Sequence, residues 1–207
     1  MTMVDHASGC SIFSGVSFCT CGAVGRLAAE AQAIHPTAFI HPKAHVQDAS
    51  VGARTKVWQF ASVTGGTVLG EDCSVSPSAM LHGPVFGDRC VISGGVMMGP
   101  GFRLGSDVFV GPNVTMANDM WPRADKVGWD VEMLRDGRCV AVIVEDGVGI
   151  GAGAVILPGV RIGAGAMVAA LAACGRDVPP GHLFRRDGSI VEINPAWTRR
   201  RMRAARG

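Results

Sequence analysis

A period of six residues runs through most of the chain and strongly limits the folds that it can adopt. From Ile34 onward, a large apolar residue recurs at every sixth position, and the register slips by one residue only twice, within 46–50 and 81–85. The series is Ile34, Ile40, Val46, Val51, Val57, Val63, Leu69, Val75, Leu81, Phe86, Ile92, Met98, Leu104, Val110 and Met116, and it resumes as Val144, Ile150, Ile156, Ile162, Val168 and Cys174. Glycine often follows these residues directly, as it does at Gly70 and Gly105.

A strict period of six does not match a helix face, which needs apolar residues three and four positions apart. It matches short strands joined by tight corners, with one inward aliphatic residue per strand and a small residue where the chain turns. Three such units would close a triangular coil of 18 residues. Coils would then stack as parallel strands about 4.8 Å apart, and the stack would supply the core that one repeat cannot form alone. The sequence therefore predicts an all-β parallel β-helix of about six or seven coils.

The period also divides the chain into segments. Residues 1–33 lack it and form an N-terminal extension, with a short helix predicted over 25–33, and residues 34–181 form the β-helix. Residues 117–143 interrupt the repeat as an insertion loop, and a long excursion inside a compact repeat is often functional. Residues 182–207 are predicted to form a short C-terminal cap followed by a basic tail.

Composition excludes several classes of protein. Of the 207 residues, 48% are hydrophobic and 17% are charged, which rules out a disordered chain. No apolar run approaches the ~18 residues of a membrane-spanning helix, and the first residues lack the basic region of a signal peptide. The seven cysteines show no disulfide spacing, which favours a reducing cytoplasm. A net charge of +2 gives no reason to expect a nucleic-acid partner, and we expect no membrane partner either.

One edge of the predicted β-helix gathers residues that can carry chemistry. Stacking by coil places Leu81 and Met116 in one column, so His82 and Asn118, which follow them, lie on one edge two coils apart. Two strand spacings correspond to about 10 Å. The insertion leaves from the same edge. Histidine accepts protons near neutral pH, and backbone N–H groups at glycine-rich corners are suited to hold an oxyanion. His82 is thus a candidate base or substrate ligand, with an exposed corner histidine as the alternative.

The six-residue repeat resembles that of the hexapeptide-repeat acyltransferases, and this resemblance implies a left-handed parallel β-helix. Residues 111–118 (GPNVTMAN), followed by Trp121-Pro122-Arg123, resemble a stretch of the nucleotide-sugar 3-amino N-acetyltransferases. Trp58-Gln59-Phe60 resembles their Trp-His-Phe, and residues 144–158 resemble their cofactor-side coils. The resemblance implies acetyl-CoA as donor, a nucleotide-linked amino sugar as acceptor, a homotrimer with sites between subunits, and a place in lipopolysaccharide biosynthesis.

The column argument and the resemblance together assign roles to individual residues, and no metal is among them. The catalytic residues expected are His82 and Asn118, and the substrate-binding residues are Ser78, Asn113, Trp121 and Arg123. Those expected to bind the cofactor are Gly151, Gly153, Arg161, Ala172 and Arg176, the two arginines through CoA phosphates. Three positions depart from the motif: Gln59 replaces a histidine, Ser78 an asparagine and His82 a glycine. These departures leave open which group acts as the base and which sugar is bound.

Three other functions remain open at this point. An O-acetyltransferase acting on a sugar or small alcohol is the main rival, because such enzymes often use a corner histidine. A non-catalytic scaffold would account for the coils but not for the tryptophan-rich insertion. A metal enzyme of the γ-carbonic-anhydrase type needs three histidines around zinc, whereas the repeat beyond its first coils offers only His82. We interpret His35, His41 and His45 as structural.

Overall fold

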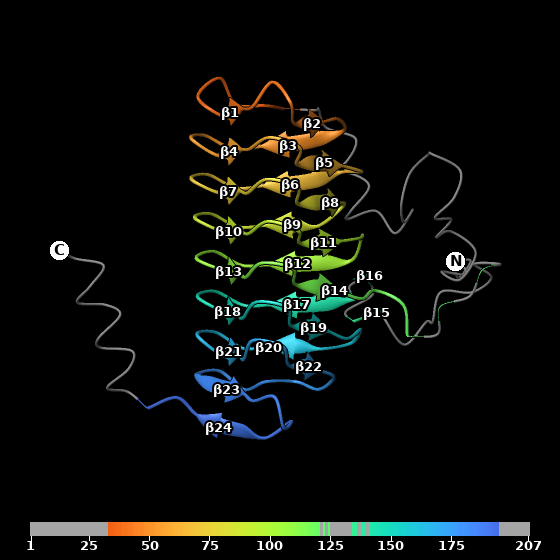
Figure 1. Cartoon of the computed structure of the whole chain (residues 1–207), viewed down its shortest axis with the longest axis vertical. Helices are drawn as coiled ribbons and strands as arrows, with labels where there is room; N and C mark the ends of the chain where they lie inside the picture. Colours follow the sequence, from red (N-terminus) through yellow and green to blue (C-terminus); the bar gives the residue numbers. More distant parts are fainter. Residues whose placement is uncertain are drawn as a thin grey trace, which may run out of the picture.

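The computed structural model describes residues 33–120, 122, 124, 134–135, 138–139 and 141–194. These residues form no helix; their strands stack in parallel into a β-helix of about seven turns (Figure 1). The structure thus confirms the predicted left-handed parallel β-helix with an inserted loop and a C-terminal cap. No helix of the described residues is long and apolar enough to cross a membrane.

Three sheets form the sides of the β-helix. We call them faces 1, 2 and 3 in the order in which the chain meets them. Face 1 consists of β1 (Phe39–Ile40), β4 (Lys56–Val57), β7 (Ser74–Val75), β10 (Val91–Ile92), β13 (Phe109–Val110), β18 (Gly149–Ile150), β21 (Met167–Val168), β23 (His182–Phe184) and β24 (Ile190–Glu192). Face 2 consists of β2 (His45–Val46), β5 (Ser62–Thr64), β8 (Met80–His82), β11 (Met97–Met98), β14 (Thr115–Met116), β19 (Val155–Ile156) and β22 (Ala173–Cys174). Face 3 consists of β3 (Ala49–Val51), β6 (Thr67–Leu69), β9 (Val85–Phe86), β12 (Phe102–Leu104), β17 (Val142–Val144) and β20 (Arg161–Ile162).

The turns between faces stack into three columns, which we name by the faces that they join. Corner 1–2 comprises residues 58–60, 76–78, 93–95, 111–113, 151–153 and 169–171. Corner 2–3 comprises residues 47–48, 64–66, 82–83, 99–101, 117–141, 157–159 and 175–177, counted from the residue that follows the last buried one of face 2. Corner 3–1 comprises residues 52–54, 70–72, 87–89, 105–107, 145–147 and 163–165. Both predicted register slips fall at corner 2–3.

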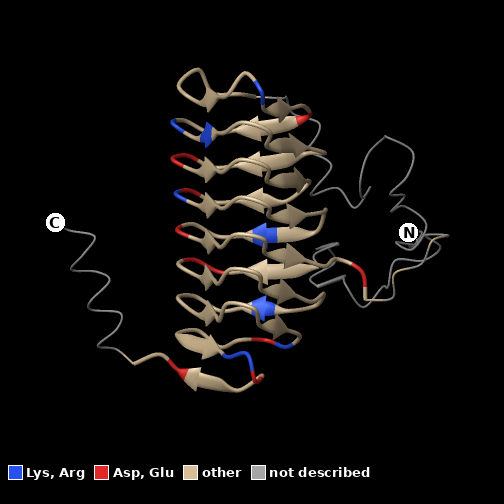
Figure 2. Cartoon of the chain, viewed as in Figure 1, with Lys and Arg blue, Asp and Glu red and all other residues tan. Residues whose placement is uncertain are grey.

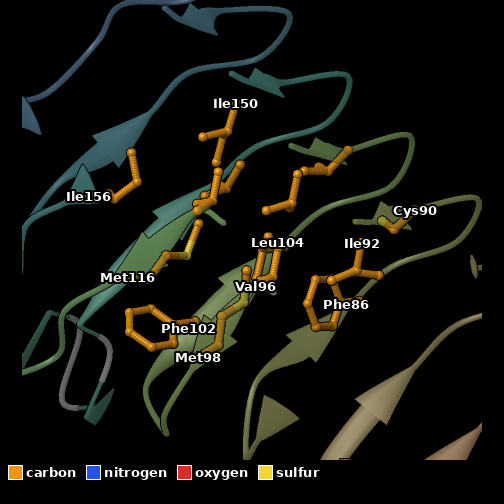
Figure 3. Close-up of a cluster of buried hydrophobic side chains, with 14 of the residues drawn as sticks. Phe86, Cys90, Ile92, Val96, Met98, Phe102, Leu104, Met116, Ile150 and Ile156 are labelled. Carbon is orange, nitrogen blue, oxygen red and sulfur yellow. The ribbon is translucent and has the colours of Figure 1, made fainter. Parts of the chain in front are cut away.

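The six-residue series fills the interior, as its period predicts. Leu81, Met98 and Met116 are direct neighbours on successive coils of face 2, and each is 5% exposed or less. Figure 3 shows this stacking of buried side chains in the middle coils.

Most two-residue strands carry one buried residue, as expected. From Val51 onward, a second buried residue also precedes each member of the series by two positions. Ala79, for example, is 0% exposed beside Leu81 and Phe102 is 1% exposed beside Leu104, so these residues complete the layers.

The two ends of the stack differ. Ile34, the first member of the series, is 41% exposed, because no coil described in the structure lies above it; its assignment to the core is therefore wrong. At the other end, β23 still pairs in parallel with β21, so the stacking continues through Phe184. β24 then pairs antiparallel with β23 and forms the cap.

The insertion departs at corner 2–3 after Met116 of β14, on the right of Figure 1. Its described part includes a two-stranded antiparallel pair, β15 (Leu134–Arg135) with β16 (Arg138–Cys139). The chain rejoins the stack at Ala141, whose N–H donates to the Gly101 carbonyl at 2.7 Å. The predicted helix at 25–33 and the basic tail lie outside the described residues, apart from residue 33, which is not helical.

Candidate active site at corner 2–3

His82 closes β8 at corner 2–3 with its side chain exposed. Leu81, the residue before it, points inward and is 1% exposed, and the alternation of a strand therefore turns His82 outward. In register, His82 pairs with Thr64 of β5 one coil earlier. The Nδ1 atom of His82 lies 3.0 Å from the Thr64 hydroxyl oxygen, within hydrogen-bonding distance. The imidazole is thus tied to the neighbouring coil by one nitrogen.

Asn118 lies on the same corner as His82, as the column argument predicts. The pairing of Leu81 with Met98 and of Met98 with Met116 places the two residues two coils apart, which corresponds to about 10 Å. The half-buried Asn118 amide donates from Nδ2 to the Pro100 carbonyl at 3.1 Å. This bond orients the side chain over the coil that separates it from His82.

Glycines line the corner between His82 and Asn118. A Cβ atom on Gly99 would lie 2.9 Å from Nδ2 of Asn118, and one on Gly83 would lie 3.2 Å from Cβ of Pro100. Larger residues would not fit beside these neighbours without movement. Residues without a side chain therefore occupy this part of the corner, with His82 on one side of it and Asn118 on the other.

At Gly83 of this corner, the backbone N–H already has hydrogen-bond acceptors within the fold. Its N–H lies 3.0 Å from the Thr64 carbonyl oxygen and 2.9 Å from the Thr67 hydroxyl oxygen. Both contacts bridge successive coils. The expectation that corner N–H groups hold an oxyanion therefore does not extend to Gly83, whose donor already has acceptors.

Two of the four predicted substrate-binding residues lie at a different corner from His82. Ser78 and Asn113 are at corner 1–2, where both adopt left-handed φ angles of 61° and 56°. Ser78 begins the side that His82 ends, four residues along an extended strand, or about 13 Å. Within one chain, Ser78 and Asn113 are not brought to His82. Trp121 and Arg123 lie outside the described residues.

The uncharged residues that are predicted to bind the cofactor have structural roles in the fold. Gly151 and Gly153 lie at corner 1–2, where a Cβ on Gly151 would overlap the Ala170 backbone. Gly153 has a φ of 65°, which favours glycine. Ala172 is 1% exposed, its N–H donates to the Ala169 carbonyl, and its carbonyl accepts from Val155. Ala172 therefore offers neither its side chain nor an unused backbone group to a ligand.

The two predicted phosphate-binding arginines have protein partners. Arg161 donates from Nε to Glu145 at 2.8 Å, and this contact, reinforced by the Ala164 N–H, holds the pKa of Glu145 below its usual value. Arg176 donates from Nη2 to the Gly188 carbonyl in the cap. A CoA phosphate would have to share or replace these partners.

Sequence reasoning missed the side chains that support His82 from the coil before it. Thr64 contacts the ring, and the buried hydroxyl of Thr67 donates to the Thr64 carbonyl at 2.6 Å. The signal was available, because one coil of 18 residues separates His82 from Thr64. Among the described residues, no group of three or more His, Cys, Asp or Glu side chains is placed to hold a metal ion.

Comparison with known proteins gives a partial match in sequence and matches in fold. No protein-family profile matches the sequence. The chain is 30% identical over 112 residues to the bifunctional protein GlmU of Heliobacterium modesticaldum, a match that covers 54% of this chain and 19% of GlmU. The chain thus spans about a fifth of that relative's length.

Two solved structures share the fold at low sequence identity. One is the UDP-N-acetylglucosamine acyltransferase of Francisella novicida, with a TM-score of 0.54, 16% identity, and coverage of 81% of this chain and 73% of the other. The other is LpxA, the UDP-N-acetylglucosamine acyltransferase of Bacteroides fragilis, with a TM-score of 0.52, 19% identity, and coverage of 81% and 77%. These likenesses establish the β-helix fold.

Proposed function

We propose that this protein is an acyl-CoA-dependent acyltransferase, and specifically an N-acetyltransferase that acts on the amine of a nucleotide-linked sugar. The observation that carries the proposal is the convergence at corner 2–3 of an exposed imidazole, a half-buried amide and the departing insertion. The names of the solved structures that share the fold support transfer of an acyl group to a nucleotide sugar. The motif resemblance at 111–123 supports an amine as the acceptor.

The chemistry assigned to the corner is an aminolysis of a thioester. The amine nitrogen attacks the carbonyl carbon of acetyl-CoA, a C–N bond forms and the C–S bond breaks. The amine loses one proton to His82, and the departing thiolate takes up a proton and leaves as free CoA. Asn118 can accept a hydrogen bond from the sugar through Oδ1 while Nδ2 stays bonded to Pro100. General-base catalysis of this kind is typically worth ~10²–10⁴-fold in rate.

The proposal includes a homotrimer, for which the outer faces give a physical reason. Large apolar side chains stand exposed on faces 1 and 2, among them Phe39, Val91, Phe109, Met80 and Met97. Val91 and Phe109 are register neighbours on face 1, as Met80 and Met97 are on face 2, and exposed apolar surface of this kind marks interaction sites. A neighbouring copy would also bring Ser78 and Asn113 of corner 1–2 within reach of a substrate held at corner 2–3. Light scattering should give three times the mass of one chain; a monomer would contradict this part of the proposal.

An O-acetyltransferase is the second candidate, because a corner imidazole serves an alcohol equally well. The deciding experiment incubates the protein with acetyl-CoA and matched pairs of UDP-, dTDP- and GDP-linked sugars that differ only in an amine or a hydroxyl. We expect acetylated amino sugar by mass spectrometry, with release of one CoA thiol per product. Acetylation of the hydroxyl partner alone would establish the second candidate instead. Binding without turnover of any pair would favour a scaffold. A cytoplasmic location stays a prediction.

A further inference from the structure

The coil before His82 forms a fitted support for its imidazole ring. Gly65 lies directly beneath the ring, with a φ of 64°, which is left-handed. A Cβ atom on Gly65 would lie within 2.7 Å of the Cε1, Nδ1 and Nε2 atoms of His82, closer than real Cβ contacts. The edge of the ring that carries both nitrogens therefore occupies the space that any other residue at position 65 would fill.

Thr64 fixes the rotation of the same ring. Its hydroxyl oxygen lies 3.0 Å from Nδ1 of His82, and strand pairing between β5 and β8 places the two residues side by side. A hydrogen bond to one imidazole nitrogen determines which nitrogen carries the proton. Since the Thr64 hydroxyl can donate to Nδ1 or accept from it, this contact couples both the orientation and the tautomer of the ring to Thr64.

A buried hydroxyl holds this support in place. Thr67 is 0% exposed, donates to the Thr64 carbonyl at 2.6 Å, and accepts from the Gly83 N–H at 2.9 Å. It thereby links the residue that contacts the ring to the residue that follows His82. Corner 2–3 has one residue fewer at this coil than at the coil before, and the Thr67 hydroxyl spans the resulting gap.

We propose that Thr64 and Gly65 are positioning residues that orient the His82 imidazole for proton transfer. The inference rests on the proposed function, since it assumes that His82 acts in the reaction. Its structural half, that the two residues set the orientation and tautomer of the ring, can be tested without any substrate.

The kinetic test compares two glycines with the same backbone angle. Gly65 and Gly165 both have a φ of 64°, but a Cβ on Gly165 would meet nothing within 4 Å. Gly65→Ala and Gly165→Ala therefore carry the same conformational strain, and only the first displaces the His82 ring. We expect both to lower the Tm equally. Gly65→Ala should lower kcat on the order of 100-fold, the cost of a misplaced reacting group, with the KM for acetyl-CoA unchanged.

Equal kcat values for the two alanine variants would overturn the positioning role of Gly65. For Thr64, the pair is Thr64→Val against Thr64→Ser. The valine variant should lose activity, and the serine variant, which restores a hydroxyl, should recover most of it. Loss of activity in both, or in neither, would contradict the assignment.

The spectroscopic test uses ¹⁵N-histidine labelling of the apo protein, with His82→Ala to assign the ring signals. The ¹⁵N shifts of Nδ1 and Nε2 report the tautomer directly. We expect the tautomer ratio of His82 to change in Thr64→Val and Gly65→Ala and to stay as in the wild type in Gly165→Ala. An unchanged ratio in all three would overturn the inference. If the ratio changes but His82→Ala retains full activity, the support is real and the proposed base is wrong.

Discussion

Corners 3–1 and 2–3 turn the same chain by opposite means. At corner 3–1, successive coils are joined by charged side chains: Arg54 binds Asp72 and Arg89 binds Asp107, each at 2.7 Å. Figure 2 shows these turns as blue and red loops along one edge. At corner 2–3, the turn residues that lie between His82 and Asn118 are Gly83, Gly99, Pro100, Gly101 and Ala117. At corner 3–1, side chains hold successive coils together. At corner 2–3, small residues surround the His82 imidazole and the Asn118 amide.

Each corner is also supported by one buried threonine, and the two threonines differ in what they serve. The Thr55 hydroxyl donates to the Gly70 carbonyl at 2.7 Å and accepts from the Cys73 N–H at 2.9 Å. Thr67 makes the same kind of bridge beneath His82. They are the two polar residues that are fully buried in the described part of the chain. The comparison teaches that a similar bridge can serve stability at one corner and a candidate site at the other.

The largest expected effect distinguishes the corners by activity. His82→Ala should lower kcat by ~10²–10⁴-fold with little change in acetyl-CoA affinity, because it removes the proposed base. Arg89→Met at corner 3–1 should leave kcat within about twofold, because an exposed ion pair contributes little. Steady-state kinetics across pH 6–9 measures both. Near-normal kcat/KM in His82→Ala would mean that the base is elsewhere or that the substrates pass the proton themselves.

A substitution in the buried core should have the next largest effect, a loss in the free energy of unfolding. Ile92 is 0% exposed between Val75 and Val110 of the neighbouring coils. Ile92→Ala should lower the free energy of unfolding by about 2–5 kcal/mol, because it removes buried methyl groups and leaves a cavity. Ile34→Ala at the open end, where the side chain is 41% exposed, should cost well under half of that. Urea unfolding of both variants tests the difference; equal losses would contradict the stacking described.

The two buried threonines provide the third comparison. Thr55→Val and Thr67→Val should each lower the free energy of unfolding by about 1–3 kcal/mol, because each removes a buried hydrogen-bonded hydroxyl. Thr67→Val should have the smaller loss, since the Gly83 N–H keeps the Thr64 carbonyl as an acceptor. Only Thr67→Val should also lower kcat. A loss of kcat in Thr55→Val would remove the functional distinction between the corners.

The smallest expected effect concerns the charges of corner 3–1. Hydrogen bonds from arginine hold the pKa values of Asp72, Asp107 and Glu145 below their ordinary values. The unfolded chain therefore takes up protons first as pH falls, so this stabilisation is present above about pH 4 and is lost on acidification. Glu145→Gln should cost about 0.5 kcal/mol at pH 7, after allowance for solvent screening, and nothing at pH 2. A pH-independent loss would contradict the electrostatic account.

The sequence predicts the stack better than the site, for physical reasons. The six-residue series specifies which residues are buried, and the column of Leu81 and Met116 correctly places His82 and Asn118 on one edge. The spacing of one coil makes Thr64 a neighbour of His82, but such a pattern does not reveal the rotation of the ring, and thus not its contacts with Thr64 and Gly65. Nor does it reveal which backbone groups the fold already uses, and Ala172, which the resemblance assigns to the cofactor, lies inside the coil.

The central claim, that acetyl-CoA reacts at corner 2–3 beside His82, can be tested directly by methyl NMR. Met80 and Met97 are 54% and 50% exposed on face 2 beside that corner, whereas Met167 lies half-buried on face 1. The protein is labelled with ¹³C-methyl methionine, assigned by single Met→Leu variants, and titrated with acetyl-CoA. The account predicts saturable shifts of the Met80 and Met97 methyl signals with Met167 unmoved. Shifts confined to Met167, or none at millimolar acetyl-CoA, would contradict it.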